Sequence, residues 1–201
     1  PGMMTMQQAT VPQGTTLGAN TTSGAAGIAL GNRVVMRGFV DFIFSYDDAD
    51  NNSTHPGSQT EKFDTAADVD FLFDFSPVTA ELHIAMDKDD ISLEQAFGRY
   101  SLNRDFNFSF GRQLTVLGYE ADEAPGLFAV SNAYYLGDKA SSAQTRRNYK
   151  DGVRANFNNG KFGLTVGLHD GYWANDDFNG DNIALDIAAS LMIIPGLEAR
   201  L

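Results

Sequence analysis

The chain has 201 residues, of which 43% are hydrophobic, and it carries a formal net charge of −12 without a single cysteine. The absence of cysteine excludes a disulfide framework and thiolate-ligated metals. The negative charge argues against nucleic acid as a partner, because phosphate binding requires clustered Lys and Arg, and no apolar run approaches the roughly 18 residues of a membrane-spanning helix.

Residues 1–31 are rich in Thr, Gly, Ala, Gln and Met and show no amphipathic period. This composition predicts a flexible N-terminal leader. From residue 32 onwards almost every segment alternates between apolar and polar residues, which is typical of β-strands. The first such segment, VMRGFVDFIFSY at 35–46, has apolar residues at even positions and carries Arg37 and Asp41 on the other face. We therefore expect a leader over 1–31 and a β-domain over 32–201.

The next two segments, 63–75 and 78–86, predict a hairpin that turns at Ser76 and Pro77. A two-residue turn at this point brings all apolar pairs onto one face and all polar pairs onto the other, as a stable register requires. The predicted pairs are Phe75–Val78, Phe73–Ala80, Phe71–Leu82, Asp74–Thr79 and Asp70–His83.

Three further hairpins follow along the chain, which brings the prediction to about nine strands. The paired segments are 94–102 with 106–113, 152–157 with 162–169, and 183–193 with 197–201. The pairs predicted across their turns include Tyr100–Phe108, Arg99–Ser109 and Phe157–Phe162.

The connections between the predicted strands alternate in length. Short turns lie at 76–77, 103–105, 158–161 and 194–196, and long polar loops lie at 47–62, 87–92, 113–150 and 170–182. Short turns on one rim and long loops on the other are typical of transmembrane barrels of the outer-membrane type.

Three features favour a lipid-facing apolar side over an ordinary soluble sandwich. The strands run about 9 to 13 residues, which is near the length of a tilted membrane strand. Aromatic residues gather near strand ends, as in the girdles of membrane barrels. The other faces carry charges of both signs, which suits an aqueous lumen. We therefore expect an all-β, antiparallel, transmembrane up-and-down β-barrel. Because nine is odd and the last strand stops at Leu201, we expect an incomplete part of a larger barrel.

Several motifs resemble a family of bacterial outer-membrane proteins, the OmpL-like β-barrel porins. The motifs are QAF-x-x-Y at 95–100, GRQLTVLGYE-x-x-EAP at 111–125, GVRA at 152–155 and GLHDGYW at 167–173. The resemblance covers about 80 residues through these motifs and extends over 34–201 through the strand pattern. It implies a channel in the outer membrane of a Gram-negative bacterium, through which small hydrophilic solutes or ions diffuse passively.

The candidate functional residues fall into two groups. The first consists of polar residues that alternate with the apolar ones along the strands and would line the pore. These pore-lining candidates are Arg37, Asp41, Asp68, Asp70, Asp74, Glu81, His83, Gln95, Arg99, Arg154 and Asp186. The second lies in the loop 113–150, which is long enough that it must fold inward or form a lid. Its constriction candidates are Tyr119, Glu120, Glu123, Arg146 and Arg147.

Arg112 stands apart from both groups, because it falls on the apolar register of its strand. This position predicts that Arg112 lies beyond the membrane edge or that a β-bulge shifts it.

The sequence predicts no enzyme and no resident cofactor. His83 opposite Asp70 is interpreted as a lumen hydrogen-bond pair, because no motif of a nucleophilic triad accompanies it. The acidic stretches at 47–52, 87–90 and 175–182 lie on the long-loop rim, where they would either be solvated or hold divalent cations. The expected partners are outer-membrane lipids, small solutes and further copies of the chain.

Two alternatives to a porin stay open at this stage. One is a non-conducting outer-membrane barrel with an anchoring, adhesive or structural role. The other is a soluble β-sandwich or lectin-like binder with acidic loops, in which the phenylalanine-rich faces would form a dry core.

Overall fold

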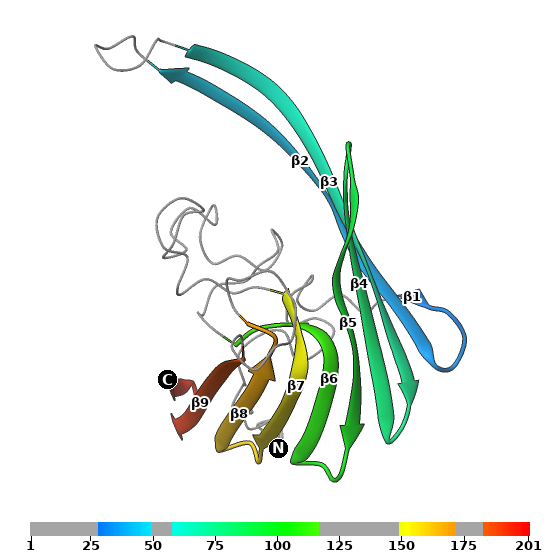
Figure 1. Cartoon of the computed structure of the whole chain (residues 1–201), viewed down its shortest axis with the longest axis vertical. Helices are drawn as coiled ribbons and strands as arrows, with labels where there is room; N and C mark the ends of the chain where they lie inside the picture. The colour runs from blue at the N-terminus through cyan, green and yellow to red at the C-terminus, as the bar shows by residue number, and fades with distance from the viewer. Residues whose placement is uncertain (1–27, 50–57, 117–148, 172–182) are drawn as a thin grey trace, which may run out of the picture.

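The structure is a computed structural model that describes residues 28–49, 58–116, 149–171 and 183–201. In these ranges the chain forms one antiparallel sheet of ten strands, which lie side by side in chain order (Figure 1). This confirms the all-β, up-and-down prediction. The described ranges contain no helix long and apolar enough to cross a membrane. The strands are β1 (Ile28–Ala29), β2 (Val34–Ala49), β3 (Ser58–Phe75), β4 (Val78–Asp87), β5 (Ile91–Ser101), β6 (Phe106–Leu114), β7 (Tyr149–Asn158), β8 (Phe162–His169), β9 (Ala184–Ile194) and β10 (Leu197–Arg200).

The register of the first predicted hairpin is confirmed at all five pairs, from Phe75–Val78 to Asp70–His83. The pairs Tyr100–Phe108 and Arg99–Ser109 are confirmed as well. These registers follow from the turn and from the requirement that apolar residues share one face.

One predicted pair is wrong. Phe157 pairs with Leu164, and the rings of Phe157 and Phe162 are diagonal neighbours with centroids 6.3 Å apart. The turn explains the difference, because the Asn159 side-chain oxygen accepts hydrogen bonds from the N–H groups of Lys161 and Phe162. These bonds hold Phe162 in the turn, so the pairing of β7 with β8 begins with Asn158 opposite Gly163. Phe157 is therefore opposite Leu164, two positions beyond the predicted partner Phe162.

Three predicted boundaries also differ from the structure. Strand β1 lies inside the predicted leader, where Ile28 pairs with Met36. Strands β2 and β3 are 16 and 18 residues long, so they take up half of the predicted loop at 47–62. The predicted long loop at 87–92 is a tight turn, because the Asp87 carboxylate accepts hydrogen bonds from the N–H groups of Asp89 and Asp90 at 2.7 Å each.

The two faces of the sheet differ in polarity and in exposure. On β3, Asp68 and Asp70 are buried, whereas Phe63 and Phe75 are 64% and 52% exposed. We call the side of the sheet that carries Asp70 the polar face and the side that carries Phe75 the apolar face. Over the described residues, the buried side chains are mostly polar or charged, and the buried hydrophobic ones are Phe97, Leu114, Val116 and Ala188.

The β2–β3 hairpin extends past the other strands (Figure 1). Among the described strands, residues 42–49 and 58–65 pair only with each other. At the other end of the sheet, the described pairing of β10 is with β9. The described register therefore leaves one edge at β1 and β2 and another at β10.

Candidate functional site

The register sets polar residues of successive strands side by side on the polar face. Each side chain points to this face because the strand period is two, and antiparallel pairing then joins the positions into rows that run across the sheet. One row is Arg99, Ser109, Arg154, Gly167 and Asp186, and the next is Ser101, Asn107, Asn156, Thr165 and Ala188.

The first half of the site, on β3, β4 and β5, is built around His83. Its Nδ1 lies 2.7 Å from Asp70 Oδ1 and its Nε2 lies 3.2 Å from Glu81 Oε2. The second oxygen of Glu81 lies 3.3 Å from Arg99 Nη1. A ring nitrogen that faces a carboxylate has to donate a proton, so the pair of carboxylates favours the doubly protonated, positively charged ring.

A β-bulge between β4 and β5 positions Gln95 at this cluster. His83 pairs with Gln95 and Ile84 pairs with Leu93, so Glu94 is the extra residue. Gln95 Nε2 lies 3.4 Å from His83 Nδ1, and Gln95 Oε1 accepts a hydrogen bond from the Leu114 N–H at 3.0 Å. Gln95 therefore connects the His83 cluster to the chain that leaves β6.

That chain turns onto the polar face. We call Leu114–Val116 the crossing segment, and each of its three residues is at most 4% exposed. The Leu114 carbonyl accepts a hydrogen bond of 2.6 Å from Arg154 Nη2 on β7, and the Val116 N–H donates one of 3.0 Å to Asp186 Oδ2 on β9. The crossing segment is thus held by three side chains from three different strands.

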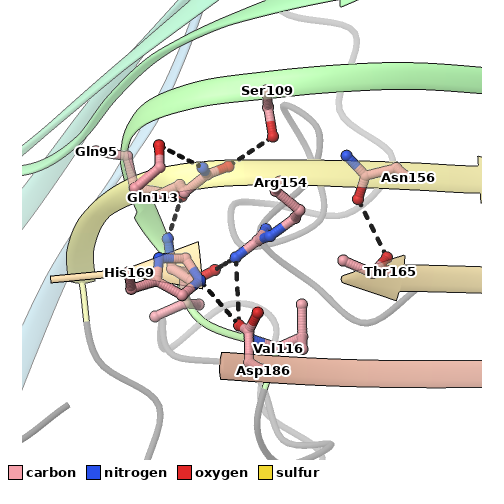
Figure 2. A network of polar contacts seen from close by, with 11 residues as sticks. Gln95, Ser109, Gln113, Val116, Arg154, Asn156, Thr165, His169 and Asp186 are labelled. Atoms are coloured by element: carbon pink, nitrogen blue, oxygen red, sulfur yellow. Dashed lines mark hydrogen bonds and ion pairs between the residues drawn. The ribbon is translucent and has the colours of Figure 1, made fainter. Parts of the chain in front are cut away.

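Asp186 is the centre of the second half of the site (Figure 2). Its Oδ2 lies 3.1 Å from His169 Nε2 and 3.8 Å from Arg154 Nη2, and all three side chains are fully buried. Figure 2 shows these three side chains converging beside Val116. A carboxylate with two cationic or donor neighbours and a backbone N–H is well satisfied even when it is buried.

Two glycines make room for this second half. A Cβ atom on Gly167 would lie 2.0 Å from Asp186 Oδ1 and 2.6 Å from His169 Nε2, and one on Gly152 would lie 2.6 Å from His169 Nδ1. Because both positions point to the polar face, any larger residue would displace the His169–Asp186 pair.

The predicted pore-lining residues lie on the polar face but do not form one cluster. Asp70, Glu81, His83, Gln95 and Arg99 come together around His83, whereas Arg154 and Asp186 belong to the second half. The remaining candidates lie outside both halves: Arg37 is opposite Asp70, Asp41 is opposite Ala66, Asp68 is buried beside Asp70, and Asp74 is exposed near the Ser76 turn.

The constriction candidates Tyr119, Glu120, Glu123, Arg146 and Arg147 lie outside the described residues. The described start of their loop, Thr115 and Val116, folds onto the polar face.

Several site residues were missed by sequence reasoning. Ser109, Asn156 and Thr165 could have been found from the alternation of their strands, and Asn156 and Thr165 are joined by a hydrogen bond of 3.1 Å (Figure 2). Gln113, which accepts a hydrogen bond from Ser109, also follows the alternation of β6. For Thr115 and Val116 there was no periodic signal, because the chain leaves the strand there.

Of the acidic rim, the stretch 87–90 forms a turn, whereas 47–49 belongs to strand β2. In the turn, Asp89 accepts a hydrogen bond of 2.5 Å from Lys88 Nζ, which raises the pKa of Lys88. Over the described ranges, no group of three or more His, Asp or Glu side chains has a geometry that could hold a metal ion. The stretches 50–52 and 175–182 lie outside these ranges, so bound divalent cations stay a prediction.

No protein-family model matches the sequence, and no curated protein matches it either.

Proposed function

We propose that the chain forms the wall of a water-filled outer-membrane channel, a porin, through which small hydrophilic solutes or ions diffuse passively. The observation that carries this proposal is the distribution of side chains, which are polar on the buried face and apolar on the exposed face. A soluble sandwich buries its apolar faces, whereas a membrane barrel turns them to lipid and lines its interior with polar residues.

The spacing of aromatic residues supports the same proposal. Phe75, Tyr100, Phe108 and Phe162 are exposed near the short turns, and Phe42, Phe44, Tyr46 and Phe63 are exposed towards the other end of the β2–β3 hairpin. About 12 residues separate Phe63 from Phe75 on β3, which at about 3.3 Å per residue and a tilt near 45° corresponds to a height of about 28 Å. An apolar band about 25 Å tall between two aromatic girdles is typical of outer-membrane barrels.

In this proposal the open edges of the sheet are joined by further strand pairing, because hydrocarbon leaves no partner for an unpaired backbone N–H or C=O group. The crossing segment would narrow the lumen beside Arg154 and Asp186, since it occupies the polar face in front of them. Charged groups of both signs then line the narrowed part, where they act on passing ions at short range.

A non-conducting barrel is the second candidate, and the crossing segment is what favours it. Leu114 and Val116 add buried apolar side chains to a polar face that already carries Phe97 and Ala188. If they seal the lumen, the barrel would anchor or assemble without transporting solutes.

Conductance in planar lipid bilayers separates the two candidates. We expect stable single-channel steps, and we expect Asp41→Asn to shift the reversal potential in a salt gradient towards anions. Asp41 is suited to this test because it lies on the polar face of β2, opposite Ala66, and is partly exposed, so its carboxylate faces the proposed lumen.

Asp89→Asn is the matched control, because Asp89 is exposed in a rim turn where salt screens its charge. A chain that inserts into the bilayer and passes no steady current would contradict the porin proposal and favour the sealed barrel.

A further inference from the structure

The apolar face is short on three neighbouring strands, β6, β7 and β8. On β8 it runs from Phe162 to Leu168, and on β6 and β7 it is one position shorter. On β6 it runs from Phe106 to Phe110, and on β7 from Phe157 to Val153. The next positions on this face are Arg112 and Asp151, which the register sets directly opposite each other. On β3 the same face continues as far as Phe63.

This places charges at a depth where lipid would be expected. Arg112 is about six residues from Phe106, which corresponds to a height of about 14 Å for a strand tilted near 45°. In the proposed membrane setting, an apolar band about 25 Å tall would therefore have Arg112 and Asp151 near its middle. A charged side chain that faces lipid is most unfavourable at that depth.

The contacts of the two side chains show that they satisfy each other only in part. Arg112 Nη1 lies 3.7 Å from Asp151 Oδ2, and Arg112 Nε donates a hydrogen bond of 3.2 Å to the Leu93 carbonyl. The side chains remain 32% and 60% exposed, respectively. They therefore still present charge to whatever covers this part of the apolar face.

The molecule that covers this part of the apolar face could be a lipid or a second copy of the chain, and the opposite charges of Arg112 and Asp151 distinguish the two. A lipid phosphate would suit Arg112 alone, but the Asp151 carboxylate beside it would repel a phosphate. A surface with one positive and one negative group side by side is complementary to itself after a two-fold rotation. A second copy of this chain therefore fits the patch better than a lipid headgroup does.

The surroundings of the pair suit close contact between two copies. Arg112 is opposite Ala96, and the ring of Phe110 covers Gly98, so the neighbouring strand adds no large side chain. Phe110 and Val153 are 53% and 55% exposed and flank the charges. Large apolar residues around a desolvated charge pair are typical of the centre of an interface.

We propose that Arg112, Asp151, Phe110 and Val153 form the interface of a homodimer or of a dimeric contact within a larger homo-oligomer. In it, Arg112 of one copy faces Asp151 of the other. The inference rests on the proposed membrane setting, because only lipid makes the exposed charges unfavourable.

Disulfide crosslinking tests this contact, since the chain has no cysteine of its own. The full chain with Val153→Cys, inserted into phosphatidylethanolamine–phosphatidylglycerol vesicles and oxidised, is expected to form a covalent dimer. Val40→Cys is the matched control, because Val40 is even more exposed on the apolar face, at 75%, but lies on β2. It is expected to remain monomeric.

Charge reversal tests the role of the ion pair. Asp151→Arg in the Val153→Cys background is expected to lower the crosslinked fraction on the order of tenfold, because it sets like charges against each other. The additional change Arg112→Asp is expected to restore the dimer, which also shows that the loss was not due to misfolding. Equal crosslinking of Val40→Cys and Val153→Cys, no crosslinking of Val153→Cys, or no rescue by the double change would overturn the interface.

The crosslinking result and the porin proposal can fail separately. A chain that conducts but stays monomeric contradicts the interface alone. A chain that crosslinks at position 153 but passes no current contradicts the porin alone.

Discussion

Replacing Asp186 by alanine is expected to lower the free energy of unfolding by about 3–5 kcal/mol, because it leaves the buried Arg154 guanidinium without its carboxylate. The same change removes the acceptor of the Val116 N–H and the partner of His169. The bonds from Gln95 and Arg154 to Leu114 would remain. In addition to the loss of stability, we expect a larger single-channel conductance.

Urea unfolding of the chain in lipid vesicles measures this loss. Asp89→Ala is the matched control, since Asp89 is 75% exposed in a turn and its removal is expected to change stability by no more than about 0.5 kcal/mol. Gly167→Ala should resemble Asp186→Ala in direction, because the added methyl group would collide with the Asp186 carboxylate. If Asp186→Ala were as stable as Asp89→Ala, the crossing segment would not depend on the second half of the site.

Replacing Val40 by lysine is expected to destabilise the inserted chain by about 2 kcal/mol, because a lysine that faces lipid costs about 2–4 kcal/mol at the bilayer midplane and less towards the interfaces. Val40 is 75% exposed on the apolar face of β2. Its partner Ala67 lies eight residues from Phe75 at the short turn, which corresponds to a height of about 19 Å within the apolar band. In a water-soluble protein, the same exposed position would tolerate lysine within about 0.5 kcal/mol.

The neighbouring residue gives the matched control for this change. Asp41 lies on the polar face of the same strand, opposite Ala66, and is partly exposed. A lysine there would reach the aqueous lumen, so Asp41→Lys is expected to be much less destabilising than Val40→Lys in the same unfolding measurement. Similar effects of the two changes would mean that both faces contact the same medium.

Much of the fold was predictable because alternation and turn chemistry agree over long stretches. In the hairpin around Ser76, the turn fixes the register and the register in turn places Asp70 opposite His83. This is why the Asp70–His83 pair could be predicted from the sequence, whereas the β-bulge that brings Gln95 to His83 could not. The same reasoning failed by two positions at Phe157, where the side chain of Asn159 determines the turn and alternation cannot detect it.

The second half of the site could not be predicted, because it depends on a chain that leaves its strand. Alternation placed Arg154 and Asp186 on the polar face, but it gave no reason to expect Leu114 and Val116 between them. Gly152 and Gly167 likewise look like ordinary strand glycines until the positions of His169 and Asp186 are known. Contacts across three strands leave no local pattern in the sequence.

A channel wall requires lipid on the apolar face and water on the polar face of the sheet. Spin labels on single cysteines of β9 measure directly which medium touches each face. Ile187 and Leu191 lie on the apolar face, whereas Ala188 and Ser190 lie on the polar face. In lipid vesicles, labels at 187 and 191 should be relaxed mainly by dissolved oxygen, and labels at 188 and 190 mainly by a water-soluble nickel chelate. If the nickel chelate reached 187 and 191 as readily as 188 and 190, the apolar face would be in water and the channel proposal would be wrong.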